Sequence, residues 1–80
     1  MPSIRAGRWR LVIIPNDHEP RHVHARLGAG RALEATVLLE RNGTVSLREA
    51  RGLTNSEIRE VMVAVRAHFD RLALLWEAYC

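Results

Sequence analysis

The sequence of 80 residues has no lysine, a single cysteine and few aromatic side chains. Because Cys80 has no partner, the fold cannot depend on a disulfide framework, which agrees with a reducing compartment. The longest apolar run in the first half, residues 11–14, is far shorter than the roughly 18 residues of a membrane span, so we expect no membrane partner. The N-terminus lacks the apolar segment and cleavage site of a signal peptide, so we expect a cytoplasmic protein.

The length and composition limit the architecture. A chain this short buries only about 60–65% of the surface that it exposes when unfolded, which excludes a two-domain enzyme with a large cofactor cleft. Hydrophobic residues make up 48% and charged residues 26%, which is typical of a globular rather than a disordered chain. We therefore expect a single domain over residues 1–80.

The basic residues are unusual in kind. All 12 are arginine, against 9 acidic residues, which gives a formal net charge of +3. Arginine makes bidentate contacts with phosphates and carboxylates and stacks on bases, which favours an anionic partner such as nucleic acid or an acidic protein. A GC-rich coding bias explains the same composition, and the charge alone does not separate these interpretations.

Polar and apolar residues alternate through much of the first half of the chain, as they do in half-buried strands. The pattern predicts strands over residues 8–14, 22–27, 31–40 and 44–48. A glycine-rich turn at 28–30 separates the second and third strands, and Asn42-Gly43 predicts a type I′ hairpin between the third and fourth.

A helix is predicted over residues 55–79. Thr54 and Glu57 have the spacing of a capping box, in which each side chain bonds the other's backbone N–H. An apolar stripe then recurs at spacings of four and three: Ile58, Met62, Val65, Phe69, Leu72, Trp76 and Tyr79. The expected fold class is α+β, a three- to four-stranded antiparallel meander with one long C-terminal helix packed on a face.

A second, smaller apolar stripe lies opposite the first on this predicted helix: Val63, Ala67, Leu74 and Ala78. Nothing within the chain is left to cover it, so we predict a partner interface there, through a homo-oligomer or a cognate protein. A solvated helix face rich in alanine is the alternative. Trp76 either anchors that interface or completes the intrachain core.

Three of the four histidines lie in residues 17–24, which read Asp-His-x-Pro-x-His-x-His. In a strand His22 and His24 share one face, while Asp17 and His18 lie in the preceding loop. Such a cluster can bind a metal, transfer protons near neutral pH, or hold the loop through hydrogen bonds.

Two histidines on one strand, without a cysteine or a distant third ligand, are a thin ligand set, so we expect metal to be dispensable and no cofactor to be bound. Neighbouring arginines favour a metal-free site, because arginine neutralises phosphate while histidine transfers protons. The predicted nucleic-acid-binding residues are Arg8, Arg10, Arg21 and Arg26. The candidate catalytic residues are Asp17, His18, His22 and His24.

This motif, followed by a glycine-rich turn, a short hairpin and a helix ending near Trp-Glu-x-Tyr, resembles a bacterial family, domain of unknown function 4160. The pattern covers the chain from Arg10 to Tyr79, and members are about this size. The family's motif usually reads Asp-His-x-Pro-Pro-His-x-His, and Arg21 stands here in place of the second proline. The resemblance implies a link to toxin–antitoxin pairs. It also implies characteristic positions at Asp17, His18, His22, His24 and Trp76.

Two functional hypotheses follow. The first is the toxin component of a toxin–antitoxin pair, acting on RNA as a metal-independent ribonuclease, with a cognate small antitoxin-like protein as partner. The second is a non-enzymatic module that binds RNA, DNA or another small protein. The histidine and arginine cluster, the basic balance and the family resemblance favour the first hypothesis. The lack of an evident nucleophile and the small size, which leaves little depth for a closed active site, favour the second.

Overall fold

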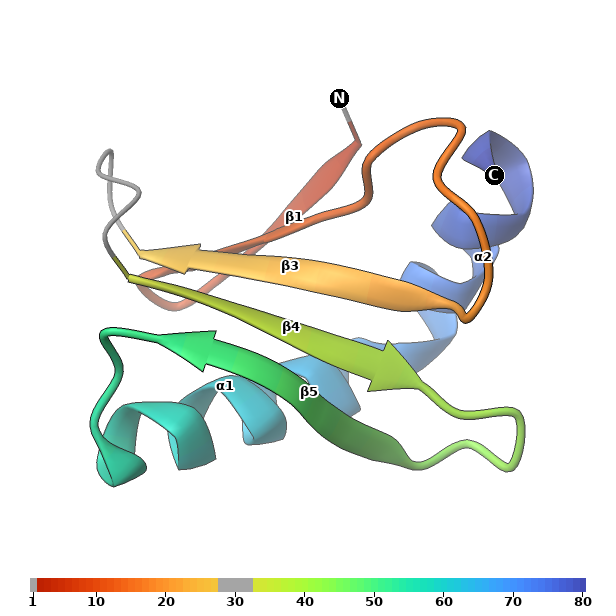
Figure 1. Cartoon of the computed structure of the whole chain (residues 1–80). Coiled ribbons are helices and arrows are strands. Elements are labelled where there is room, and N and C mark those ends of the chain that lie inside the picture. The colour runs from red at the N-terminus through yellow and green to blue at the C-terminus, as the bar shows by residue number, and fades with distance from the viewer. Residues whose placement is uncertain (1, 28–32) are drawn as a thin grey trace.

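The computed structural model describes residues 2–27 and 33–80, which form an antiparallel sheet followed by two helices (Figure 1). The five described strands lie side by side in their order along the chain. The elements are β1 (Ser3–Ala6), β2 (Trp9–Val12), β3 (His22–Leu27), β4 (Glu34–Leu39), β5 (Val45–Arg51), α1 (Asn55–Ala67) and α2 (Phe69–Tyr79). The α+β class and the antiparallel meander are confirmed, with one more strand and one more helix than expected.

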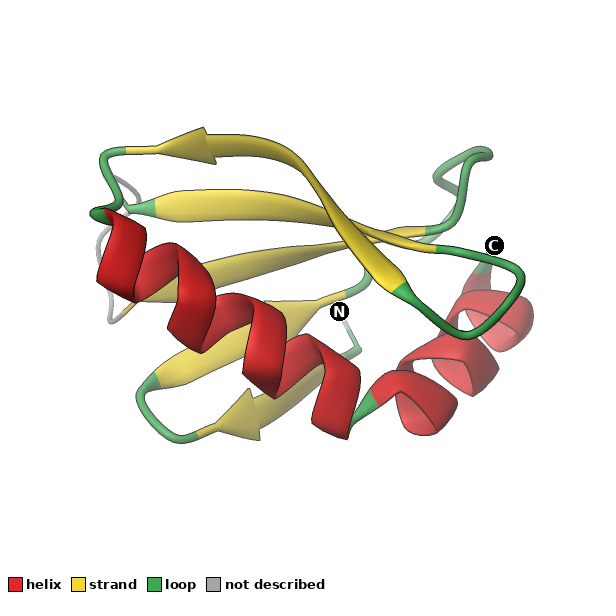
Figure 2. Cartoon of the chain, turned by 90° about the horizontal axis from the view of Figure 1, so that it is seen from below, coloured by secondary structure: helices red, strands yellow, loops and turns green. Residues whose placement is uncertain are grey.

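The sheet has an apolar face and a polar face, because side chains alternate along each strand. Leu11, Ala25 and Ala35 lie opposite one another on β2, β3 and β4, and all are buried. Figure 2 shows α1 crossing the strands. Both helices contribute buried residues to the same core as these strand residues: Val61, Val65, Leu72 and Trp76. Neither helix in the described residues is long and apolar enough to cross a membrane.

Strand β1 is not predicted by the sequence, because its four residues are too few to show a period and only Ile4 is buried. The hairpin that follows explains how β1 joins the sheet. Ala6 and Trp9 are paired, and Gly7, the first of the two residues between them, has a φ of 61°. A type II′ turn requires glycine at that position.

The β4–β5 hairpin differs from the type I′ turn predicted for Asn42-Gly43. That turn needs a positive φ at both central residues, and here only Gly43, at 89°, has one. The Glu40 N–H bonds to the Thr44 carbonyl at 2.9 Å, which leaves a three-residue loop with glycine last. Such loops are a common hairpin alternative. The turn predicted at 28–30 and the predicted strand start at residue 31 lie outside the described residues.

The predicted capping box is present at the start of α1. The Thr54 hydroxyl accepts a hydrogen bond from the Glu57 N–H at 3.1 Å, and the Glu57 carboxylate accepts one from the Thr54 N–H at 2.8 Å. Two backbone donors that a helix start would leave unpaired are therefore satisfied.

The prediction of a single helix over residues 55–79 is wrong, because the helix is interrupted at His68. That residue, with φ −110° and ψ 18°, ends α1 and precedes α2. A straight helix of this length would extend about 37 Å at 1.5 Å per residue. The largest extent of the molecule is 30 Å, so the break keeps the second half on the core. Leu72 and Trp76 are buried as a result.

Candidate functional site

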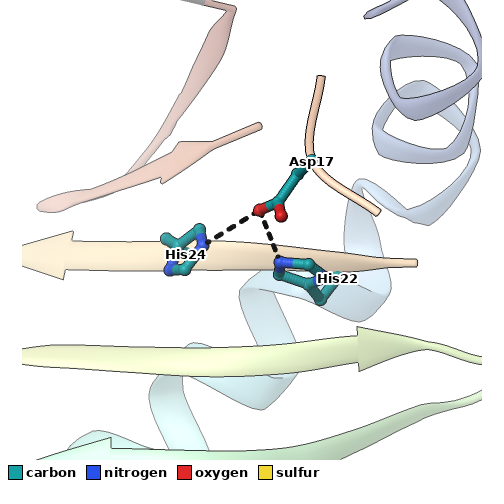
Figure 3. A group of neighbouring side chains, drawn as sticks. All are labelled: Asp17, His22 and His24. Atoms are coloured by element: carbon teal, nitrogen blue, oxygen red, sulfur yellow. Dashed lines mark hydrogen bonds and ion pairs between the residues drawn. The ribbon is translucent and has the colours of Figure 1, made fainter. Parts of the chain in front are cut away.

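The loop of residues 13–21 connects β2 to β3 and contains Asp17. Asn16 has a φ of 64°, and its N–H bonds to the Tyr79 carbonyl of α2 at 2.9 Å. The Asp17 N–H bonds to the Ile14 carbonyl at 3.3 Å, and the Asp17 carboxylate accepts the His18 N–H at 3.0 Å. The loop is thereby fixed to α2, and Asp17 reaches toward the two histidines of β3 (Figure 3).

His22 is 6% exposed, and both of its ring nitrogens face oxygen acceptors. Nδ1 lies 2.7 Å from the Pro20 carbonyl oxygen and Nε2 lies 2.9 Å from Asp17 Oδ2. The ring also packs against Trp76, with 5.2 Å between ring centroids. Trp76 itself is buried, which confirms the alternative that it completes the intrachain core.

His24 lies beside His22 in an edge-on arrangement, with ring centroids 5.2 Å apart. Its Nε2 is 4.0 Å from Asp17 Oδ2, and its Nδ1 is 3.3 Å from Glu34 Oε2. Both nitrogens are buried, and neither makes a hydrogen bond of acceptable geometry within the described residues. Burial lowers the pKa of His24, and the positive charge of a protonated His22 lowers it further, against the opposing effect of Glu34. The ring is therefore neutral at neutral pH.

Asp17 is held in its charged form. Burial raises the pKa of its carboxyl, but the His18 N–H bond and the bond and charge of His22 together lower that pKa below its usual value. We call Asp17, His22 and His24 the histidine site. One ligand atom from each of these residues lies within 4.8 Å of the other two, the spacing of a group that could hold a metal ion.

A row of arginines crosses the polar face beside the histidine site. Arg5 pairs with Arg10, and Arg10 pairs with Arg26, so the three stand opposite one another on β1, β2 and β3. We call these three residues the arginine row. Arg26 bonds Glu34 at 3.2 Å and lies two residues from His24, on the same face of β3. Of the predicted anion-binding residues, the structure thus brings Arg10 and Arg26 together.

Arg8 and Arg21 lie elsewhere. Arg8 Nε bonds the Glu60 carboxylate of α1 at 2.8 Å, and that bond and charge raise the pKa of the guanidinium. Arg21 Nη2 bonds the Glu40 carbonyl at 3.1 Å, and its guanidinium lies 5.8 Å from the Phe69 ring centroid. Arg8 thus contacts α1, and Arg21 contacts Glu40 and α2, so neither side chain joins the arginine row.

His18, the fourth member of the predicted catalytic set, does not join the site. Its side chain is 93% exposed, and its Nδ1 is 4.0 Å from Asp17 Oδ1. Sequence reasoning missed Glu34, which contacts both His24 and Arg26. A hairpin assumed from the sequence to be centred on residue 30 pairs positions 26 and 34. Glu34 does pair with Arg26 in the structure.

The predicted interface residues are divided by the helix break. Val63 and Ala67 lie on α1, whereas Leu74 and Ala78 lie on α2, so the four do not form one straight stripe. Val63 is 56% and Leu74 is 70% exposed within the chain. An interface at these residues stays a prediction.

Residues 9–77 match the family described as Domain of unknown function (DUF4160), and the chain belongs to that family. No curated protein and no solved structure matches the chain.

Proposed function

We propose that this member of the DUF4160 family is the toxin component of a toxin–antitoxin pair and acts on RNA in the bacterial cytoplasm. Its RNA-binding surface in this proposal is the polar face of the sheet. The arginine row is the observation that carries it. Arg5 and Arg10 are exposed, and the row ends at Arg26, beside the histidine site.

The spacing of the row suits a nucleic-acid backbone. Neighbouring strands lie about 4.8 Å apart, so the three strands hold three positive charges within about 10 Å. Positive charges at this separation repel one another, and the phosphates of a single RNA strand would relieve that repulsion. Glu34 neutralises part of the charge at Arg26, and Glu49 pairs with Arg51 at 3.5 Å on β5, so the positive excess of the face comes from Arg5 and Arg10.

The chemistry of the face favours contacts with phosphates over contacts with bases. Along the polar face the described residues carry no phenylalanine, tyrosine or tryptophan on which bases could stack. Sequence-specific RNA recognition usually holds unstacked bases against aromatic side chains and reads their edges through hydrogen bonds. We therefore propose binding of single-stranded RNA with little sequence preference.

The test measures binding of a labelled single-stranded RNA by fluorescence anisotropy over a series of salt concentrations. The variant Arg10→Glu with Arg26→Glu should weaken binding for every sequence. It should also reduce the slope of log K against log salt by about 0.7 for each phosphate that the variant no longer neutralises. Arg41→Glu with Arg71→Glu is the matched control, since it makes the same two charge changes at exposed positions outside the arginine row. Equally weakened binding in both variants would contradict a specific role for the row.

The alternative is a non-enzymatic module that binds nucleic acid or a small protein. Burial of both His24 ring nitrogens favours it, because a proton-transfer group must reach its substrate. Growth after induced expression separates the two functions. Toxicity that disappears in His24→Ala and is neutralised by the genomic neighbour supports the toxin. RNA binding without toxicity or cleavage supports the module.

A further inference from the structure

We propose that Asp17, His22 and His24 bind a divalent transition-metal ion, with zinc as the ion that the ligands fit best. The inference does not depend on RNA binding. It departs from the sequence-based expectation that metal is dispensable, because the sequence offers two ligands on a strand and only loop residues to complete the set. The structure places one of those loop residues, Asp17, beside both rings and adds the groups that orient them.

The three ligand atoms converge from the loop and from β3 (Figure 3). Asp17 Oδ2 is 2.9 Å from His22 Nε2 and 4.0 Å from His24 Nε2. Tetrahedral zinc with bonds of about 2.0–2.1 Å holds its ligand atoms about 3.3 Å apart. The observed distances lie on both sides of that value, so small side-chain rotations would complete the site.

The outer nitrogen of each histidine faces an oxygen acceptor. His22 Nδ1 lies 2.7 Å from the Pro20 carbonyl, and His24 Nδ1 lies 3.3 Å from the Glu34 carboxylate. Metal-binding histidines almost always donate the N–H of their other nitrogen to a carbonyl or carboxylate, which fixes the tautomer and the ring orientation. With hydrogen on Nδ1, the Nε2 of each ring would be free to bind a metal on the side of Asp17.

His24 supplies an independent observation. Its two ring nitrogens are buried without a hydrogen-bond partner among the described residues, and buried polar atoms in that state cost free energy. A metal bound at Nε2 would satisfy one of them and draw the ring into line with Glu34.

The donor set selects the class of metal. Two imidazole nitrogens and one carboxylate suit zinc and its neighbours in the first transition row, whereas magnesium and calcium prefer oxygen ligands alone. Three protein ligands leave one tetrahedral position open, the arrangement in which zinc holds a water molecule or a substrate group.

A metal-free explanation of the same contacts is an ion pair. The Pro20 carbonyl and the Asp17 carboxylate both accept hydrogen bonds, so both bonds of His22 form without a metal only if both ring nitrogens carry hydrogen. The two explanations differ in the protonation of one atom. Nitrogen NMR of the histidine rings should show His22 with hydrogen on Nδ1 alone when zinc is bound, and with hydrogen on both ring nitrogens when it is not.

The experiment uses the full chain without an affinity tag, stripped with a chelator and titrated with zinc chloride. We expect one zinc per chain by competition with a chromogenic chelator, and a melting temperature that rises with zinc but not with magnesium. Asp17→Asn and His24→Gln should each weaken zinc binding at least about tenfold, because each removes one ligand. Asp17→Asn retains an oxygen that can accept the His22 bond, so its fold should be preserved.

Two control variants test other sources of binding. His68→Gln removes the histidine at the helix break, and Cys80→Ser removes the exposed thiol. Both should bind zinc as the unsubstituted chain does. The proposal is overturned by less than stoichiometric binding, by unchanged affinity in Asp17→Asn and His24→Gln, or by equally weakened binding in either control. None of these readouts involves RNA, so failure here would leave the proposed RNA-binding surface standing.

Discussion

The indole N–H of Trp9 donates a hydrogen bond to the carboxylate of Glu60, which joins the β1–β2 hairpin to α1. Arg8 bonds the same carboxylate oxygen, and its guanidinium lies 5.8 Å from the Trp9 ring centroid. One acidic side chain thus accepts two donors from adjacent residues of the hairpin. Both contacts between the sheet edge and the helix are stronger when that carboxylate is ionised.

Stability should therefore fall in acid through Glu60. Hydrogen bonds from Arg8 and then Trp9 lower the pKa of this carboxyl below its usual 4.5. A lowered folded-state pKa stabilises the fold above the unfolded value and loses that contribution as pH falls through the folded value. Glu60→Gln should lower the melting temperature at neutral pH and flatten its decline below about pH 4.5. Glu77→Gln, at an exposed position on α2, should keep the wild-type pH profile.

Core packing can be tested at two positions of α2 that differ in burial. Leu72 is completely buried, whereas Leu74 is 70% exposed. Leu72→Ala should reduce the free energy of unfolding by about 2–5 kcal/mol, because it leaves a cavity. Leu74→Ala should change it by less than about 0.5 kcal/mol. Urea denaturation followed by circular dichroism measures both, and similar values would contradict the placement of α2.

The capping box predicts a smaller effect at the start of α1. Thr54→Ala removes the hydroxyl that accepts the Glu57 N–H, and should cost about 0.5–2 kcal/mol of stability. Thr54→Ser keeps the hydroxyl and should recover most of that stability. Ser56→Ala, inside the first turn of the helix, is the control and should be close to neutral in the same denaturation assay.

The predicted interface is tested by a charge at Leu74. This residue is exposed, so Leu74→Glu should leave the melting temperature of the isolated chain unchanged. If α2 is covered by a cognate partner or a second copy, the substitution should weaken that assembly about tenfold or more, or about 1.4 kcal/mol. Light scattering and co-purification with the neighbouring gene product measure it. An unchanged mass and unchanged co-purification would identify a solvated helix face.

Much of the fold follows from local pattern. The alternation through β3 and the capping box at Thr54 are both visible in the sequence, and both are present in the structure. The helix break is not visible, because the apolar stripe continues through His68 without a change of spacing. The break leaves Leu72 and Trp76 in the core, so it reflects the packing of the whole chain and not the local pattern.

The site divides in the same way. Asp17, His22 and His24 stand out as a motif, but their alignment depends on the path of loop 13–21 and on the oxygen atoms of Pro20 and Glu34. Strand register decides the place of Glu34, and the amino-acid pattern before that residue does not fix the register. Arg8 is drawn to α1 by Glu60, a partner 52 positions away along the chain.

The hydrogen bond from the Asn16 amide to the Tyr79 carbonyl has a kinetic consequence. A helix of 11 residues, as α2 is, does not persist alone in water, so it is held by its packing and by this loop. Opening of either segment must therefore expose the other, and the amides of loop 13–21 and of α2 should exchange with deuterium as one cooperative unit. The lifetime of the intact histidine site would then equal the time for which α2 stays packed on the core.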